Sequence, residues 1–204
     1  MKRGLFIVID GLGGSGKSTQ MELLKKRLPK AVYTKEPGGA PRAEKIRSIL
    51  KEGDGTPPDP LTDFFLFWAQ RAEHMAAVIR PALAKGKTVF CDRFDSSTFA
   101  MQVRGDQQKK FEKLFWQCRE AVLGEYEPDC YIILDTASGV AKSRRAGRKH
   151  GEDRFDERGE SYQRRVRTGY QEFAKSVHGH VVDAAQGPDD IHEKTWRIVS
   201  KYLR

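Results

Sequence analysis

Residues 11–18, GLGGSGKS, carry the spacing G-x-x-x-x-G-K-[S/T] at every fixed position. Glycines let backbone N–H groups turn inward around phosphate oxygens, because no Cβ stands in the way. Lys17 adds an ammonium for the β- and γ-phosphates, and the Ser18 hydroxyl suits Mg²⁺. The pattern predicts a phosphate-binding loop for a nucleotide, made of Gly11, Leu12, Gly13, Gly14, Ser15, Gly16, Lys17, Ser18 and Thr19.

The segments on either side of this loop have the patterns that the motif needs. The apolar run Leu5–Asp10 predicts a buried strand, and Gln20–Leu28 predicts a helix. A loop that leads into a helix N-terminus offers bound phosphates the positive end of the helix dipole. The alternative, a glycine-rich turn with no ligand, does not need a strand and a helix in these places.

The composition fits one domain over residues 1–204. Charged residues make up 32% and hydrophobic residues 38%, and no apolar stretch reaches 18 residues, which disfavours a membrane protein. The three cysteines, Cys91, Cys118 and Cys130, lack metal-ligand spacing. The first apolar run starts at Leu5, which leaves no room for a signal peptide. We therefore expect a protein of the reducing cytoplasm.

The net charge of +9 is concentrated in one stretch. Residues 142–167 hold ten Lys and Arg against five Asp and Glu. Nucleic acid would suit such a charge, but so would a small polyphosphate ligand, and aromatic–basic interleaving is lacking. Ala146–Asp153 is basic and contains glycines, so we predict a lid over about residues 144–156. Glu52–Pro60 has the composition of a second mobile loop.

Strand-like runs alternate with amphipathic helical patterns along the whole chain. The predicted strands are Leu5–Asp10, Ala31–Thr34, Thr88–Cys91, Tyr131–Leu134 and His180–Val182. The predicted helices are Gln20–Leu28, Ala43–Lys51, Leu61–Ala84, Gln107–Leu123, Gly139–Arg145, Ser161–Ser176 and Asp190–Leu203. Right-handed crossovers between such strands predict a three-layer α/β fold, with a five-stranded parallel sheet and helices on both faces.

Acidic residues end three of the predicted strands, at Asp10, Asp92 and Asp135. Ligands of open α/β sheets lie beyond the carboxyl ends of the strands, so these acids point toward the phosphate loop. Asp92 is placed to hold the water shell of Mg²⁺, and the adjacent Arg93 to clamp the phosphate of a second substrate. A surface ion pair at Asp92-Arg93, and a turn or capping role for Asp135, remain open alternatives.

A phosphate loop alone does not choose among GTPases, ATPases and kinases. The guanine signature N-K-x-D is absent and the chain is short for a motor ATPase, which favours a small kinase. Phe67 and Arg71 are four residues apart on one helix and share a face. Together they suit a nucleobase, by stacking and by donation to a carbonyl. A core aromatic beside a solvated arginine would give the same spacing.

The chain resembles the thymidylate kinase family nearly from end to end. The matching residues are Gly11–Gln20, Glu36-Pro-Gly-Gly39, Glu44–Arg47, Phe67–His74, Ile79–Leu83, Asp92–Thr98, Pro128-Asp129, Leu134-Asp135, Asp153–Asp156, and Val166-Arg167 with Gly169-Tyr170. The resemblance implies transfer of the γ-phosphoryl group of ATP to dTMP, giving dTDP, with Mg²⁺, in a homodimer of cytoplasmic subunits.

The same resemblance implies roles for individual residues. Lys17 and the loop amides would bind ATP, Ser18 and Asp92 the metal, and Arg144 the adenine. Arg47 and Arg93 would hold the dTMP phosphate, beside Glu36. Phe67 would stack on thymine, Arg71 would bond its O4, and Thr98 and Gln102 would read the rest of the base or its surroundings. The phosphate loop has no arginine, so a lid arginine, Arg148, would stabilise the transferring phosphoryl group, with Arg144 and Arg145 beside it.

Three positions depart from the family pattern. Gly13 replaces an acid that faces the sugar 3′-hydroxyl, Met101 replaces a tyrosine that crowds the 2′ position, and Lys35 replaces an arginine. We therefore expect a dTMP kinase with looser sugar recognition. The alternatives are a kinase for another monophosphate such as dUMP, and an ATPase that binds nucleic acid. The predicted helices Leu61–Ala84 and Gln107–Leu123 are candidate dimer surfaces, although Leu114, Phe115 and Trp116 suit a core equally well.

Overall fold

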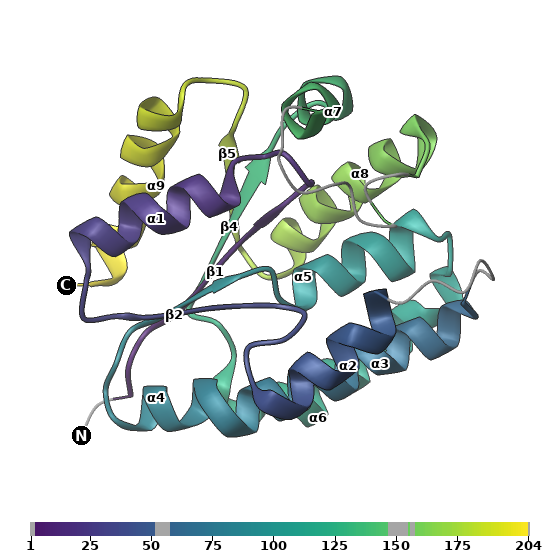
Figure 1. Ribbon diagram of the computed structural model, residues 1–204, viewed down its shortest axis with the longest axis horizontal. Helices are drawn as coiled ribbons and strands as arrows, with labels where there is room; N and C mark the ends of the chain where they lie inside the picture. Colours follow the sequence, from purple (N-terminus) through teal and green to yellow (C-terminus); the bar gives the residue numbers. More distant parts are fainter. Residues whose placement is uncertain (1–2, 52–57, 147–154, 156–157, 204) are drawn as a thin grey trace.

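The computed structural model describes residues 3–51, 58–146, 155 and 158–203 (Figure 1). A five-stranded parallel sheet in the order β2-β3-β1-β4-β5 forms its centre. The strands are β1 (Phe6–Gly11), β2 (Val32–Lys35), β3 (Val89–Asp92), β4 (Cys130–Asp135) and β5 (His180–Asp183). All five predicted strands and the predicted α/β class are confirmed. All five carboxyl ends lie at one edge of the sheet, because the strands are parallel.

The helices cover both faces of the sheet (Figure 1). The α-helices are α1 (Lys17–Arg27), α2 (Pro41–Lys51), α3 (Pro60–His74), α4 (Arg80–Ala84), α5 (Asp95–Thr98), α6 (Glu112–Leu123), α7 (Ser138–Ala146), α8 (Glu160–Ser176) and α9 (Pro188–Tyr202). Two π-helical segments, η1 (Met75–Ile79) and η2 (Phe99–Gly105), and two 3-10 turns, η3 (Lys109–Phe111) and η4 (Gly124–Tyr126), join them.

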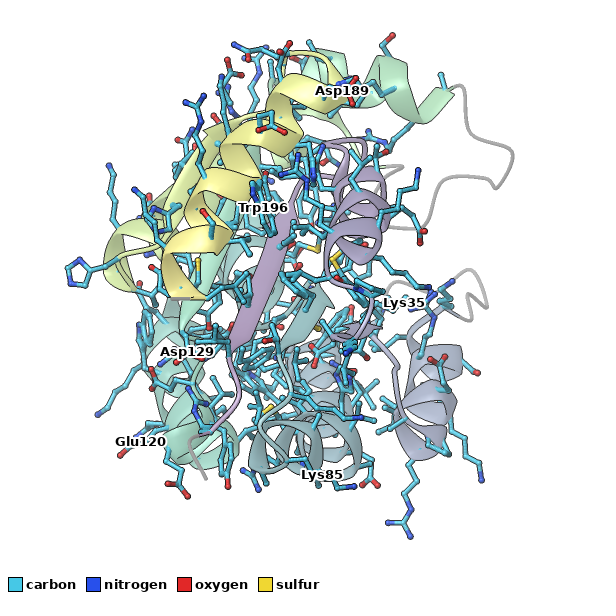
Figure 2. All side chains as sticks on the ribbon, turned by 90° about the vertical axis from the view of Figure 1, so that its left-hand side faces the viewer. Lys35, Lys85, Glu120, Asp129, Asp189 and Trp196 are labelled. Carbon is cyan, nitrogen blue, oxygen red and sulfur yellow. The ribbon has the colours of Figure 1, made fainter. Side chains whose placement is uncertain are left out.

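Alternate residues of the strands enter two separate cores. Phe6 and Val8 of β1 face a core that α3, α6 and α8 complete with large aromatic side chains. Ile7 and Ile9 face the opposite core, which α1 and α9 close. Arg27, at the end of α1, places its guanidinium over the ring of Trp196 of α9 (Figure 2). The distance from the guanidinium carbon to the ring centroid is 4.9 Å. The sheet is therefore buried on both faces, as its nearly continuous apolar strands require.

Two of the predicted helical stretches are more irregular than expected. The predicted helix Leu61–Ala84 widens into η1 between α3 and α4, because Pro81 has no N–H to donate one turn back. The predicted helix Gln107–Leu123 begins as the 3-10 turn η3 before α6. Neither α5 nor η2 was predicted from the sequence. The predicted lid at 144–156 lies mostly outside the described residues, as does most of the loop at 52–60.

Within the described part of the chain, no helix combines the length and the apolar character that crossing a membrane requires.

Two glycines let α8 lie close against η2. A Cβ at Gly169 of α8 would stand 2.9 Å from the Ala100 Cα and the Arg104 Cβ, and one at Gly105 would stand 2.7 Å from the Tyr162 ring. Such distances are shorter than ordinary van der Waals contact, so neither position has room for a larger residue. This close approach fixes α8 against the segment that follows the end of β3.

We expect Gly169→Ala to lower the free energy of unfolding by about 1–3 kcal/mol, because the added methyl overpacks this contact. Gly139→Ala in α7 is the matched control, since no described atom lies within 4 Å of its Cβ position. That control should change stability by less than about 1 kcal/mol. Urea denaturation of both variants measures the difference, and equal stabilities would contradict the packing argument.

Candidate active site

The phosphate loop joins the end of β1 to the start of α1, as the motif predicts. Gly11, Gly14 and Gly16 have φ of 145°, 87° and 97°, which side-chain-bearing residues rarely adopt. A Cβ on Gly14 would also stand 2.3 Å from the Ala141 carbonyl oxygen of α7. The glycines therefore serve both the loop conformation and the approach of α7 to the loop.

Two buried cationic side chains donate hydrogen bonds to carbonyl oxygens of this loop. The Lys17 ammonium donates to the carbonyl oxygens of Gly11 at 3.0 Å and Leu12 at 2.9 Å. The Arg145 guanidinium donates to the Gly13 carbonyl at 2.8 Å. Arg145 comes from α7, so the helix before the predicted lid is tied directly to the loop. Ser18 and Thr19 lie exposed at the first turn of α1.

A buried carboxylate, Asp10, lies at the end of β1 beneath the loop. Its Oδ1 accepts from the Gly11 N–H at 2.8 Å and the Tyr170 hydroxyl at 2.9 Å. Its Oδ2 accepts from the hydroxyls of Ser96 at 2.7 Å and Ser97 at 2.8 Å. The sequence analysis placed Asp10 near the loop but gave it no role. The structure makes it the point at which β1, α5 and α8 meet.

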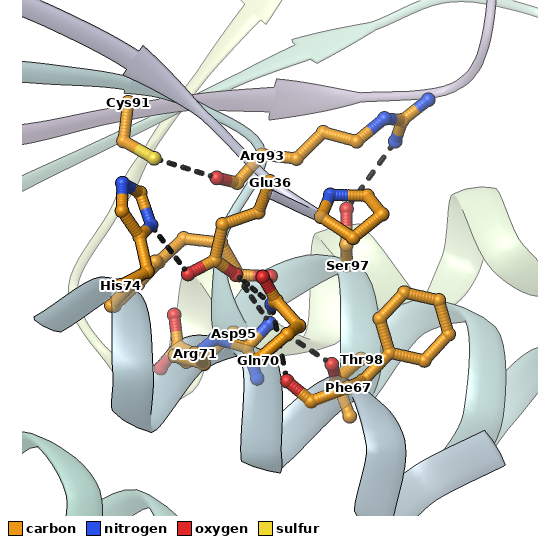
Figure 3. Close-up of polar contacts among 12 residues, drawn as sticks. Glu36, Phe67, Gln70, Arg71, His74, Cys91, Arg93, Asp95, Ser97 and Thr98 are labelled. Carbon is orange, nitrogen blue, oxygen red and sulfur yellow. Dashed lines mark hydrogen bonds and ion pairs between the residues drawn. The ribbon is translucent and has the colours of Figure 1, made fainter. Parts of the chain in front are cut away.

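Arg93 follows β3 and lies beside Asp10. Its φ of 68° is unusual for a residue with a side chain, and its carbonyl accepts from the Cys91 thiol at 3.0 Å (Figure 3). Its Nη1 donates to the Gly11 carbonyl at 3.1 Å and to the Tyr170 hydroxyl at 3.0 Å. Strained backbone of this kind is common at functional sites, where the surrounding contacts maintain it.

A second buried carboxylate, Glu36, organises the other side of the site (Figure 3). Its Oε2 lies 2.9 Å from both the Arg71 Nη2 and the Gln70 Nε2, and its Oε1 lies 3.0 Å from the His74 Nδ1. The far nitrogen of His74 is 2.7 Å from the Thr34 hydroxyl. One carboxylate therefore joins the turn after β2 to successive turns of α3.

Arg71 is only 1% exposed, and some of its buried N–H groups have a hydrogen-bond acceptor whereas others have none among the described residues. Its Nη2 donates to the Phe94 carbonyl at 2.9 Å and the Thr98 hydroxyl at 3.2 Å. Its Nε and Nη1 have no hydrogen-bond partner among the described residues. The guanidinium lies 4.7 Å from the ring centroid of Trp68. Because the side chain is buried, the alternative of a solvated arginine is wrong.

Gln102 is a second buried group without partners. The side chain is 1% exposed, and neither its amide nitrogen nor its amide oxygen has a hydrogen-bond partner in the described part of the chain. Buried amides are almost always paired, so an unpaired one indicates a ligand or water. Phe67 lies in the same site on α3, with its ring centroid 5.8 Å from that of Phe155.

Most of the remaining predicted residues lie in separate parts of the structure. Arg144 donates to the carbonyls of Ala184, Ala185 and Gln186, in the loop after β5. Arg47 of α2 donates to the Pro37 carbonyl, and Asp92 lies half-buried at the end of β3. Arg148 lies outside the described residues. Lys35 is exposed at the end of β2 (Figure 2).

Asp135 makes a bidentate ion pair with Arg167 of α8, with both distances 2.7 Å. Asp135 therefore connects β4 to α8. The sequence predicted either a place near the phosphate loop or a turn or capping role for Asp135, and neither of these includes this ion pair.

Sequence reasoning missed three residues of this network, namely Gln70, His74 and Tyr170. Gln70 and His74 lie within the same matched run as Arg71, and their four-residue spacing on α3 places them on one face. Tyr170 ends the matched run that begins at Val166. In each case the residue was visible in a motif, but its buried carboxylate partner lies at least 34 positions away along the chain.

Comparison with known proteins agrees with this geometry. A sequence model of the thymidylate kinase family matches residues 9–195. A thymidylate kinase of Jannaschia sp. is 39% identical over 98% of this chain and 97% of its own length. Another, from Ectopseudomonas mendocina, is 41% identical over 90% of this chain and 89% of its own.

The fold agrees as well. A crystal structure of thymidylate kinase from Ehrlichia chaffeensis superposes with a TM-score of 0.78 at 28% identity, covering 97% of this chain and 99% of that one. The phosphate loop and the clusters around Asp10 and Glu36 lie within residues 9–195, the range that the family model matches. This chain belongs to the thymidylate kinase family.

Proposed function

We propose that this protein transfers the γ-phosphoryl group of ATP to dTMP, giving dTDP. The observation that carries the proposal is a set of buried polar atoms without hydrogen-bond partners in the described part of the chain, namely Nε and Nη1 of Arg71 and the side-chain amide of Gln102. Leaving a buried donor unpaired costs about 1–3 kcal/mol, so such groups imply a polar ligand that satisfies them. A pyrimidine base has carbonyl and N–H groups along one edge that suit them.

The acceptor base fits the groups around Arg71. The guanidinium donates to O4 of thymine, Phe67 stacks on the ring, and Thr98 and Gln102 read the remaining edge. Glu36 holds Arg71 in place through the 2.9 Å ion pair, so the arginine enters the site already oriented. An ordered donor loses little entropy on binding, which favours affinity.

In this proposal the phosphates lie between the cluster around Asp10 and the cluster around Glu36. Arg93 and Arg47 hold the dTMP phosphate, while Lys17 and the amides of residues 11–19 bind ATP and Arg144 covers the adenine. Phosphoryl transfer needs alignment and positive charge around the equatorial oxygens more than it needs a general base. The lid arginine Arg148, with Arg145, supplies charge that the phosphate loop lacks.

The metal is Mg²⁺, and the residues present fit it. The Ser18 hydroxyl is exposed at the first turn of α1, and the Asp92 carboxylate is half-buried at the end of β3. Oxygen ligands of this kind suit Mg²⁺, partly through water. When bound, the ion neutralises charge on the β- and γ-phosphates. Three free cysteines in the described chain agree with our proposal that the protein works in the reducing cytoplasm.

A panel of nucleoside monophosphates with Mg²⁺ and ATP tests the reaction. We expect dTMP to have the highest kcat/KM and dUMP, which lacks one methyl group, to be lower by about tenfold. Turnover of UMP measures the looser sugar recognition expected from Gly13 and Met101.

Lys17→Ala should abolish transfer in the same assay. Lys25→Ala should not, because Lys25 lies exposed in the last turn of α1. A preference for a ribonucleotide, or ATP hydrolysis without transfer, would contradict the proposal.

Gln102→Met tests base recognition separately from folding. The substitution removes a buried amide that has no partner among the described residues, so the free energy of unfolding should stay equal or rise. The KM for dTMP should rise about fivefold, the equivalent of about 1 kcal/mol. A stability loss with an unchanged KM would show that the amide serves the fold instead.

We further propose a homodimer through α2 and α3. Ile49 of α2 and Leu61 and Phe65 of α3 are 55%, 39% and 49% exposed, and the two helices pack side by side (Figure 1). A second copy of this chain would bury this apolar surface. On the other predicted helix, Phe115 is fully buried in the core and Trp116 packs against that core.

Phe65→Asp should convert the dimer to a monomer, as measured by sedimentation or light scattering. Val181→Asp on β5 is the matched control, because Val181 is also 49% exposed but lies at the far edge of the sheet. A wild-type protein that is already a monomer at micromolar concentration would contradict the proposed surface.

A further inference from the structure

Tyr170 is a buried, titratable residue that the reaction proposed above does not use. It lies on α8 and is 1% exposed. Its hydroxyl touches three polar partners that come from three other parts of the chain. It donates to Asp10 Oδ1 at 2.9 Å, accepts from Arg93 Nη1 at 3.0 Å, and lies 2.9 Å from the Ser97 hydroxyl.

The hydroxyl is protonated, so it can make these contacts at the same time. Burial, with the Asp10 carboxylate nearby, raises the pKa of Tyr170 well above its ordinary value. The phenol therefore keeps its single proton, which it donates to Asp10, and its lone pairs remain available for Arg93. Gly169, the preceding residue, packs directly on η2, so the backbone that carries Tyr170 is fixed.

Arg93 depends on contacts of this kind. Its φ of 68° is unfavourable for a side-chain-bearing residue, and surrounding interactions must maintain it. Around Nη1 lie the Gly11 carbonyl at 3.1 Å, the Ser97 hydroxyl at 3.3 Å and the Asp10 carboxylate at 3.4 Å. The Tyr170 hydroxyl, at 3.0 Å, is closer to Nη1 than any of these three.

We propose that Tyr170 is a positioning residue, whose hydroxyl orients Arg93 to receive the phosphate of the acceptor nucleotide. This inference rests on the proposed function, in which Arg93 binds that phosphate. It adds that α8, which directly follows the lid region in sequence, supplies part of the phosphate-binding geometry. Tyr170 itself does not touch the substrate.

A merely structural Tyr170 would behave differently from a positioning one. A structural hydroxyl stabilises the fold, and its loss would weaken every ligand alike. A positioning hydroxyl acts through Arg93, so its loss would weaken only ligands that carry the phosphate. Comparison of dTMP with thymidine, the same nucleoside without phosphate, separates the two roles.

The test is Tyr170→Phe, which removes only the hydroxyl. We expect the dissociation constant for dTMP to rise about tenfold, the equivalent of about 1.4 kcal/mol, because hydrogen bonds to charged groups contribute about this much. The dissociation constant for thymidine and the KM for ATP should stay within about twofold of wild type. Equilibrium titration and steady-state kinetics measure these values.

Tyr131→Phe is the matched control. Tyr131 is also buried, and its hydroxyl donates at 2.8 Å to a different buried carboxylate, Asp95. It should lose comparable stability while binding dTMP and thymidine as wild type does. If Tyr170→Phe weakens both ligands equally, or neither, the positioning role is wrong.

A double-mutant cycle with Arg93→Met tests the coupling directly. In the Arg93→Met background, Tyr170→Phe should cause no further loss of dTMP affinity. Independent, additive losses would overturn the proposal. Wild-type protein that fails to phosphorylate dTMP would refute the proposed function instead, so the two failures are distinguishable.

Discussion

A carboxylate buried away from water is costly unless hydrogen-bond donors surround it, and Asp10 imposes this requirement on the molecule. Its donors come from the phosphate loop, from the turn after β3, from α5 and from α8. Each of these segments must therefore be in place before the charge is satisfied. The requirement links the position of the phosphate loop to that of Arg93, although the two are more than 70 residues apart in sequence.

Glu36 imposes a similar requirement on the opposite side of the site. It accepts from Arg71, Gln70 and His74 of one helix, so it ties the turn after β2 to one face of α3. Removing one member of such a buried cluster leaves a charge without its partner, which is more damaging than losing the pair together. The two carboxylates thus organise two separate clusters, one at the phosphate loop and one at the turn after β2.

Much of the fold could be predicted because the sheet is buried on both faces. Each strand is a short apolar run that stands out from its surroundings, and the phosphate loop has a spacing that few other structures need. The segment after β3 was missed because its start, Asp95–Thr98, is a polar run of residue types that are equally common in turns. The same limit applies to the site. Arg71 and Gln102 were found in motifs, but Tyr170 meets Asp10 across 160 positions, and no local pattern records such a contact.

The two separate cores have a consequence for how this protein can change. The helix that follows the phosphate loop packs with α9 in one core, whereas α3 and α6 pack in the other. Side chains of neighbouring strand positions enter different cores, so a substitution in one need not disturb the other. Selection can therefore change the packing around α3 and α6 while the packing of α1 against α9 is retained. Met101 lies in neither core: it packs against a third cluster, in which α8 meets Leu12 of the phosphate loop, so a substitution there would reach the loop as well.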